Sequence, residues 1–316
     1  MTGIILVNYN SASKTQFCLE SIKKQTYKDI KVYLLDNFSN TNEKLLINNL
    51  CSEYESTIKI DLFDLNENIG FSRANNLLIK KALSDGCNYI YILNNDVELL
   101  SDTVEKFIKI VESKNVEIVT NKILFRSEKN KIWFAGGIFD YKNADYKTVG
   151  YKEIDSDKYS KIYSTDWASG ASSFYTRDVF SKIGLYDEAY FFGQEEWDLS
   201  LSAIKKNIEI LYDGSNPVYH DVGGSTKFRL SFKIYLNTYN RLYFAKKNLK
   251  LIDYYLFFCK YFFYSIFLKR KTIKKTNGIS IPFFKFYKIQ ILAIYHFYLS
   301  KKINFEVLQN IDSRYA

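Results

Sequence analysis

The stretch YIYILNNDVEL, residues 89–99, is the clearest indication of the fold class in this sequence. Five apolar or aromatic residues run unbroken to Leu93, as in a buried strand, and Asn94, Asn95 and Asp96 follow at once. Similar short apolar runs occur earlier in the chain, at residues 4–7, 30–35 and 58–63, with helical patterns between them. This alternation predicts right-handed βαβ units and an α/β fold, a mainly parallel sheet flanked by helices. Functional residues are then expected at the carboxyl ends of the strands.

The second half of the chain follows a different pattern. Residues 131–163, rich in Gly, Asp, Tyr and Lys, predict a hairpin or a mobile insert. Further predicted elements are helices at 178–183 and 195–206, a strand at 208–212 before a loop that holds Pro217, and helices from Leu230 onward. Asn277-Gly278 and Pro282 predict a break between two helices of the tail.

The composition indicates a globular protein and the compartment in which it is expected. A chain of 316 residues that is 47% hydrophobic can bury a large core. Its four cysteines have no paired spacing, and the N-terminus begins with an apolar run rather than a secretory signal. We therefore expect a reduced, cytoplasmic compartment. The lack of a CxxC pair also argues against a metal site built from cysteine thiolates.

Charge divides the chain into an acidic body and a basic tail. Residues 226–316 hold 18 Lys and Arg against three acids, a net charge of +15, so residues 1–225 carry −6 of the total of +9. The tail also holds 24 of the 55 aromatic residues. Lysines mixed with aromatics suit an anionic membrane surface.

Two apolar segments of the tail, 251–268 and 289–299, pose the question of a membrane span. Asp253 and Lys260 interrupt the first segment, and the second is shorter than a span requires. We therefore expect helices that lie in the membrane interface. A transmembrane helix and a basic helical subdomain packed on the body are the alternatives.

Polar residues at the first two strand ends are candidates for a nucleotide pocket. Asn8 and Asn10 follow the first strand, and Asp36 follows the second. Adjacent strand ends of a parallel sheet can form one wall of such a pocket, with Asp36 accepting hydrogen bonds from a base or ribose. The alternative is an ordinary turn or helix cap.

A second group of candidates opens the helix after residue 70. Asn68 and Gly70 precede this helix, and Arg73 lies in its first turn. A helix N-terminus with a guanidinium group can hold a diphosphate. A capped helix with a solvated arginine is the alternative.

Candidates for a cation site are found at two further strand ends. Asn94 and Asp96 alternate on an extended segment, so both can face one ligand, and Asp96 can hold a divalent cation that bridges two donor phosphates. His220 precedes a glycine loop, in a setting that favours metal or phosphate contact. A turn at Asn94-Asn95-Asp96 and a structural histidine are the alternatives.

The stretch FFGQEEWDLS, residues 191–200, supplies a candidate general base. Glu195 and Glu196 begin a predicted helix after two aromatic residues and a glycine, and apolar walls can raise the pKa of a carboxyl toward a useful value. Acids in a first helical turn also stabilise the helix through its dipole, which is the alternative interpretation.

Taken in order, these stretches resemble the family 2 glycosyltransferases with the GT-A fold, in particular their bacterial rhamnosyltransferase-like branch. The stretches are VNYN (7–10), LLDNFSN (34–40), NIGFSRANN (68–76), LNNDVEL (93–99), WASGASSFYTRDVFSKIGLYDE (167–188), FFGQEEWDLS (191–200), VYHDVGGST (218–226) and Tyr239-Asn240-Arg241. The resemblance covers about residues 3–245. It implies a GT-A catalytic domain at 1–225, with a nucleotide-sugar half at about 1–120 and an acceptor half at about 121–225. The basic and aromatic composition of residues 226–316 predicts a helical membrane-surface extension there.

The resemblance also implies roles for single residues. Asn94 and Asp96 stand at the position of the Asp-x-Asp metal motif, whose first acid is replaced by Asn94 here. Mn²⁺ or Mg²⁺ binding therefore depends on Asp96, with His220 as a further ligand or a phosphate contact. Glu195 or Glu196 acts as the base. The residues implied on the donor side are Asn8, Asn10, Asp36, Asn68, Gly70, Arg73, Asn94 and Asn95, and those on the acceptor side are Trp167, Gly170, Phe192 and Trp197.

The implied activity is inverting transfer of a sugar from a UDP- or dTDP-sugar to a hydroxyl group of a glycan or lipid-linked acceptor, at the inner face of the cell membrane and without a nucleic-acid partner. A pyrophosphorylase would need a glycine-rich phosphate loop near the N-terminus, and a dehydrogenase or methyltransferase a G-x-G turn after the first strand, where Asn8-Tyr9-Asn10-Ser11 stands instead. A nucleic-acid-binding protein with a basic tail and an inactive glycosyltransferase-like scaffold are the remaining alternatives.

Overall fold

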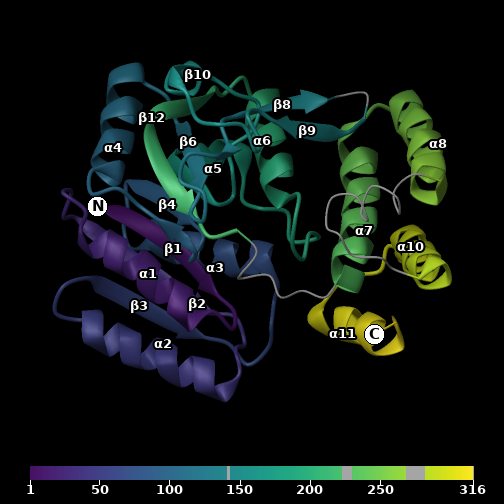
Figure 1. Ribbon diagram of the computed structural model, residues 1–316, viewed down its shortest axis with the longest axis horizontal. Helices are drawn as coiled ribbons and strands as arrows, with labels where there is room; N and C mark the ends of the chain where they lie inside the picture. Colours follow the sequence, from purple (N-terminus) through teal and green to yellow (C-terminus); the bar gives the residue numbers. More distant parts are fainter. Residues whose placement is uncertain (141–142, 223–229, 268–281, 316) are drawn as a thin grey trace. The chain divides into compact units, whose positions relative to one another are not determined.

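The computed structural model describes residues 1–140, 143–222, 230–267 and 282–315 (Figure 1). The chain divides into two compact units. Unit 1 comprises residues 1–138, 146–188 and 195–227, and unit 2 comprises 139–145, 189–194 and 228–316. The second unit thus includes two short segments from within the predicted catalytic domain, while the predicted functional division at residue 225 stays a prediction. Asn277-Gly278 lies outside the described residues.

The elements of the first unit alternate as predicted. In chain order they are β1 (Thr2–Asn8), α1 (Ala12–Lys23), β2 (Ile30–Asp36), α2 (Thr41–Tyr54), β3 (Lys59–Asp64), α3 (Phe71–Ser84), β4 (Tyr89–Leu93), β5 (Val97–Glu98), α4 (Thr103–Lys114), β6 (Ile118–Phe125), β7 (Ile132–Phe134), a 3-10 turn (Asp157–Tyr159), β10 (Ile162–Ser164), β11 (Ser172–Thr176), α5 (Val179–Ile183), α6 (Glu195–Lys205) and β12 (Ile210–His220). The predicted strands of the first third are confirmed to within two residues at each end.

One large sheet organises the first unit, with strand order β10-β12-β6-β11-β4-β1-β2-β3 (Figure 1). The half from β4 to β3 is parallel, because β1 pairs in parallel with β2 and β4, and β2 with β3. Strand β11 is antiparallel to both β4 and β6, and β12 runs parallel to β6. The α/β class and the sheet flanked by helices are confirmed, and the antiparallel strands lie in the second half.

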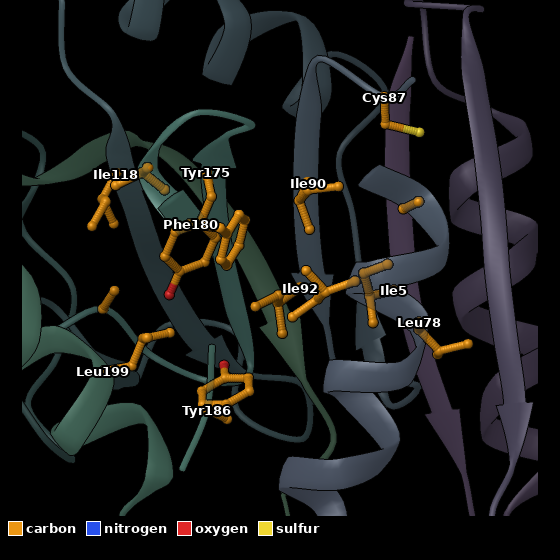
Figure 2. Close-up of a cluster of buried hydrophobic side chains, with 14 of the residues drawn as sticks. Ile5, Leu78, Cys87, Ile90, Ile92, Ile118, Tyr175, Phe180, Tyr186 and Leu199 are labelled. Carbon is orange, nitrogen blue, oxygen red and sulfur yellow. The ribbon is translucent and has the colours of Figure 1, made fainter. Parts of the chain in front are cut away.

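Helices cover both faces of the sheet, which explains why a central strand such as β4, with the sequence YIYIL, is apolar or aromatic throughout. On one face, Ile5, Ile92 and Leu78 of α3 belong to one buried cluster, which continues to α5 and α6 (Figure 2). On the other face, the ring of Tyr91 meets that of Phe107 of α4 edge-on at 5.3 Å. Alternate residues of one strand therefore pack against different helices.

Strand β12 is longer than predicted. It runs from Ile210 to His220, and its pairing with β6 shifts register between Asp213 and Val218. Pro217 falls in this irregular stretch, where a residue without an N–H group is tolerated. The proline thus marks a bulge, and the prediction of a strand end at Tyr212 followed by a loop was wrong.

Residues 131–163, predicted as a hairpin or mobile insert, contribute several short strands. Strand β7 pairs with the inner strand β6, and β10 pairs with β12 as an edge strand of the large sheet. Strands β8 (Gly137–Asp140) and β9 (Asp145–Thr148) form a separate two-stranded sheet. A hairpin-like insert is therefore present.

The second unit is built mainly from helices of the tail: α7 (Leu230–Asn248), α8 (Leu251–Phe267), α10 (Phe283–Tyr298) and α11 (Phe305–Tyr315). The phenol oxygen of Tyr235 on α7 lies 2.6 Å from Nδ1 of His296 on α10. Pro282 directly precedes α10, as the predicted break requires. Within the described residues, no helix has both the length and the apolar character that crossing a membrane demands.

Candidate active site

The ends of β1 and β2 are joined by a buried hydrogen-bond network. Asn8 and Asp36 are register partners, and Nδ2 of Asn8 donates to Oδ1 of Asp36 at 2.7 Å. Ser39 donates to the same carboxylate from its backbone N–H and its hydroxyl group, at 2.9 and 2.6 Å. Oδ2 of Asp36 receives one of these bonds, so it can accept another from a ligand N–H.

Backbone conformation at these two strand ends is uncommon. Asn10 and Phe38 have φ values of 49° and 70°, a region that non-glycine residues seldom adopt. Asn10 is held there by Ser39 Oγ, which accepts its backbone N–H, and by the side chain of Asn40. Such conformations concentrate at functional sites.

Asn95 extends this network to the end of β4. The Oδ1 atom of Asn8 accepts hydrogen bonds from Ser11, Thr15 and Asn95 at 3.0–3.2 Å. Nδ2 of Asn95 also contacts the hydroxyl oxygens of Ser11 and Thr15 at 2.8 Å. The carboxyl ends of three parallel strands, β1, β2 and β4, are thereby fixed to one another.

Asp96 and His220 come together because short strand β5 pairs with the end of β12. His220 lies opposite Val97 in this pairing, and its Nε2 atom is 3.0 Å from Oδ1 of Asp96. Both residues are buried, and the ring of Trp133 packs edge-on against the imidazole. Residues that are 124 positions apart, as counted along the chain, thus form one pair.

Lys14 brings a positive charge to the same pair. Its Nζ atom lies 3.8 Å from Oδ2 of Asp96 and 2.7 Å from Oδ2 of Asp221, and it donates to the Asp221 carbonyl oxygen at 3.0 Å. The Asp221 N–H in turn donates to the carbonyl of Asp96. The ammonium group partly balances the two carboxylates.

The Asp96–His220 pair fits a divalent cation that substrate phosphates help to hold. Among the described residues, His, Cys, Asp and Glu do not gather in groups of three or more that could hold a metal. Mg²⁺ in nucleotide sites commonly uses only one or two carboxylates, with phosphates and water completing its shell. Nδ1 of His220 is buried without a hydrogen-bond partner in the described structure, whereas Nε2 faces the Asp96 carboxylate.

The loop before α3 is tied to the end of β2. The amide of Asn37 donates to Oδ1 of Asn68 at 3.2 Å and to the carbonyl of Gly70 at 3.3 Å. Gly70 has a φ of 83°, which favours glycine. The Nε atom of Arg73 lies 3.6 Å from a carboxylate oxygen of Glu188, and contact of its guanidinium group with a donor diphosphate stays a prediction.

The predicted base lies next to a predicted acceptor-side glycine. A Cβ atom on Gly170 would come within 3.6 Å of Cβ of Glu196, and the following residue, Ala171, accepts the backbone N–H of Asn94 at 3.0 Å. Glu196 is therefore linked through two neighbouring residues to the strand end that carries Asp96. Burial raises the pKa of Tyr175 to about 12, and the negative charge of Glu196 adds to this rise.

Glu195 is buried at the start of α6, and aromatic rings surround this helical turn. Trp167 and Trp197 meet edge-on at 6.0 Å, and Tyr146 packs against both of them. These contacts give one side of the site an aromatic wall.

A family model described as "Glycosyl transferase family 2" matches residues 3–184, more than half of the chain. The chain belongs to glycosyl transferase family 2. The glycosyltransferase is similar to the low-salt glycan biosynthesis hexosyltransferase Agl10 of Haloferax volcanii, at 24% identity over 76% of this chain and 73% of the relative. It is also similar to the rhamnosyltransferase WbbL of Escherichia coli, at 25% identity over 79% of this chain and 94% of the relative.

Solved structures support the GT-A fold of this glycosyltransferase. GalNAc-T7 with UDP, GalNAc and Mn²⁺ matches 93% of this chain with a TM-score of 0.63 and 15% identity, and the match spans 57% of GalNAc-T7. TarS 1-349 of S. aureus in complex with UDP-GlcNAc matches 94% of this chain with a TM-score of 0.55 and 13% identity, over 80% of that structure. The chain is a glycosyltransferase of the hexosyltransferase type.

Most predicted site residues of the glycosyltransferase lie together in unit 1. Arg73 is among them and pairs with Glu188, and the exception is Phe192, which belongs to unit 2. There, Asn240 donates to the carbonyl oxygens of Phe192 and Gly193 at 3.0 and 2.7 Å. The role of Phe192 on the acceptor side stays a prediction.

Four polar residues of the glycosyltransferase site were missed in the sequence: Ser11, Lys14, Thr15 and Ser39. Ser39 could have been found, because a serine three residues after an aspartate often hydrogen-bonds to its side chain. Lys14 resembles any solvated lysine on a helix, and only its distant partners distinguish it.

A separate hollow of the glycosyltransferase is lined by residues such as Met1, Lys31 and Asp85. It lies at the amino ends of β1 and β2, whereas the predicted site lies at their carboxyl ends, and it contains none of the predicted site residues.

Proposed function

We propose that the chain transfers a sugar from a UDP- or dTDP-sugar to a hydroxyl group of a glycan or lipid-linked acceptor, in the synthesis of cell-surface polysaccharide or protein-linked glycan. The observation that carries this proposal is the joined carboxyl ends of β1, β2 and β4, which place Asp36 and the Asp96–His220 pair in one connected network. The names of the relatives support the substrate class, since one acts in glycan biosynthesis and the other transfers rhamnose.

On the donor side, Asp36 accepts a hydrogen bond from the pyrimidine base through Oδ2, while Asn8 and Ser39 hold its carboxylate in place. The titles of the two solved structures, which contain UDP or UDP-GlcNAc, support a pyrimidine nucleotide. Asp96 and His220 would hold Mn²⁺ or Mg²⁺. When bound, the cation neutralises the charge that builds up on the departing diphosphate.

On the acceptor side, Glu196 is the proposed base, with Glu195 as the alternative. Its carboxylate takes the proton of the acceptor hydroxyl as that oxygen forms a bond to the anomeric carbon, and the bond from this carbon to the diphosphate oxygen breaks. A single displacement inverts the anomeric configuration and needs no covalent intermediate on the enzyme. The aromatic wall formed by Trp167 and Trp197 excludes water from this side.

A thermal-shift screen of nucleotide sugars with and without Mn²⁺ tests the proposal. A ligand at about 100 times its Kd stabilises the folded state by about 2.7 kcal/mol, so binding is readily seen. We expect UDP- or dTDP-sugars to raise the Tm only when the cation is present, and Asp96→Asn to abolish this dependence. ADP-sugars serve as the control. Equal Tm shifts with all nucleotide sugars, or no shift with any of them, would contradict the proposed pocket. In a separate assay, donor hydrolysis by the wild type would distinguish an enzyme from an inactive scaffold.

A further inference from the structure

The helix α8 exposes a continuous apolar face. Its members are Leu251, Ile252, Tyr255, Leu256, Phe262 and Phe263. At 3.6 residues per turn these positions share one side of the helix, and Ile252 and Phe263 are 74% and 62% exposed. Soluble proteins rarely leave so many large apolar side chains together in water.

The helix α10 of the same unit repeats this pattern. Its exposed apolar residues are Phe284, Ile291, Tyr295, Tyr298 and Leu299. Phe284 and Ile291 are 77% and 64% exposed, and the exposed Lys288 lies among them. The opposite side of α10 is buried, with Phe297 packed against Tyr239 of α7.

The two apolar faces lie on one side of the helix pair. Phe258 contacts Tyr298 at 6.1 Å between ring centroids, and Gln290 donates to the carbonyl of Ser265, so the helices are antiparallel. Viewed along each helix axis from its N-terminus, the apolar face is rotated by about a quarter turn from these contact residues, and the direction of rotation is the same in both helices. Two antiparallel helices with this arrangement are related by a two-fold axis normal to their plane. Their apolar faces therefore point in the same direction and form one surface, which we call the α8–α10 face.

We propose that the α8–α10 face binds in the headgroup region of an anionic lipid bilayer. Residues 250–302 carry eleven Lys and Arg and a single acid, Asp253, so their charge complements anionic lipid. A second copy of the chain would instead set exposed lysines such as Lys250, Lys260 and Lys288 against their counterparts. Exposed Tyr and Phe with lysines around them suit the interface between water and acyl chains. This binding would hold the enzyme at the inner face of the membrane, and it does not depend on the proposed donor or cation.

Vesicle sedimentation of the full chain tests this proposal without any donor. We expect binding to vesicles of phosphatidylcholine with phosphatidylglycerol, weak binding to phosphatidylcholine alone, and release at high salt. The double variant Ile252→Glu/Phe263→Glu should bind at least about tenfold more weakly, because both side chains leave water on binding. Lys288→Glu should weaken binding to anionic vesicles roughly tenfold. Leu45→Glu, at a residue 60% exposed on α2 in unit 1, is the matched control and should bind like the wild type.

A fluorophore on Cys259 gives a second readout of the same surface. Cys259 is exposed on α8, Cys18 and Cys87 are buried, and Cys51→Ser removes the remaining partly accessible thiol. We expect a blue shift of an environment-sensitive label on addition of anionic vesicles. No sedimentation with anionic vesicles, unchanged binding of Ile252→Glu/Phe263→Glu, or retention on RNA without vesicle binding would each overturn the proposal. A dimer in solution that the same double variant dissociates would overturn it in favour of a second copy.

Discussion

The replacement Asn8→Ala tests whether the hydrogen bonds that join the strand ends stabilise the fold and position the donor-binding residues. The Asn8 side chain donates to Asp36 and Ser39 and accepts from Ser11, Thr15 and Asn95. A bond to a charged group contributes about 1.5–3 kcal/mol and a neutral one about 0.5–1.5 kcal/mol. The groups left behind keep other partners, since Ser39 still donates to Asp36 and Asn95 to Ser11. We therefore expect the free energy of unfolding to fall by about 3 kcal/mol, below the simple sum.

Urea unfolding and calorimetric titration with UDP measure the two consequences of Asn8→Ala. Donor affinity should fall by about tenfold, since loosening the Asp36 carboxylate costs about 1.4 kcal/mol of binding. Gln25→Ala is the matched control, because this buried side chain makes three hydrogen bonds, to Ser21, Leu100 and Val104, and none to the proposed site residues. It should lose stability while binding UDP normally. A loss of stability below about 1 kcal/mol in Asn8→Ala, or an equal loss of UDP affinity in both variants, would refute the reasoning.

Four further predictions concern single groups. Glu196→Gln should leave donor affinity nearly unchanged and lower turnover by at least ~10²-fold, and wild-type transfer would remove Glu196 from the role of base. Asp96→Ala should bring transfer to the level that a chelator produces in the wild type, and indifference to both would refute the cation. Lys14→Met should lower the cation concentration needed for half-maximal donor binding, because it removes a positive charge that lies 3.8 Å from Asp96 and would repel the cation, and a higher requirement would refute this. Burial, with a smaller contribution from Lys301, lowers the pKa of His296 in the folded chain. The unfolded chain then binds the proton first, so stability should be complete above about pH 6.5 and fall as the pH drops toward the lower folded pKa, a decline that His296→Gln should flatten in unfolding measurements.

The alternation of the first unit could be predicted because inner strands such as β4 are buried on both faces and the helices between the strands have one apolar face. Residues such as Ile92 and Tyr91 pack on opposite sides of the sheet, so the whole strand reads as apolar. The bulge at Pro217 could not be predicted, since a proline in a strand and a proline in a loop look alike without the neighbouring strand.

The candidate site was predicted in part. Asp36, Asn95 and Asp96 follow apolar runs directly, so their place at strand ends follows from local pattern and sheet topology. The place of Lys14 in the site depends on its contacts with Asp96 and Asp221. These residues are far from Lys14 in the sequence, so the local sequence pattern does not reveal the contacts. The pairing of Arg73 with Glu188 was missed for the same reason.

The two short segments that join the helical tail in unit 2 set a condition for recombining enzymes of this family. Arg241 of α7 pairs with Asp145 and donates to the carbonyl of Asn143, and Asn240 holds the carbonyls of Phe192 and Gly193. A chimera that exchanges only residues after 227 would part each of these side chains from its counterpart. A graft that carries residues 139–145 and 189–194 along with the tail would preserve all of these contacts. The segment to exchange is therefore discontinuous in the sequence, although it forms one compact unit in the protein.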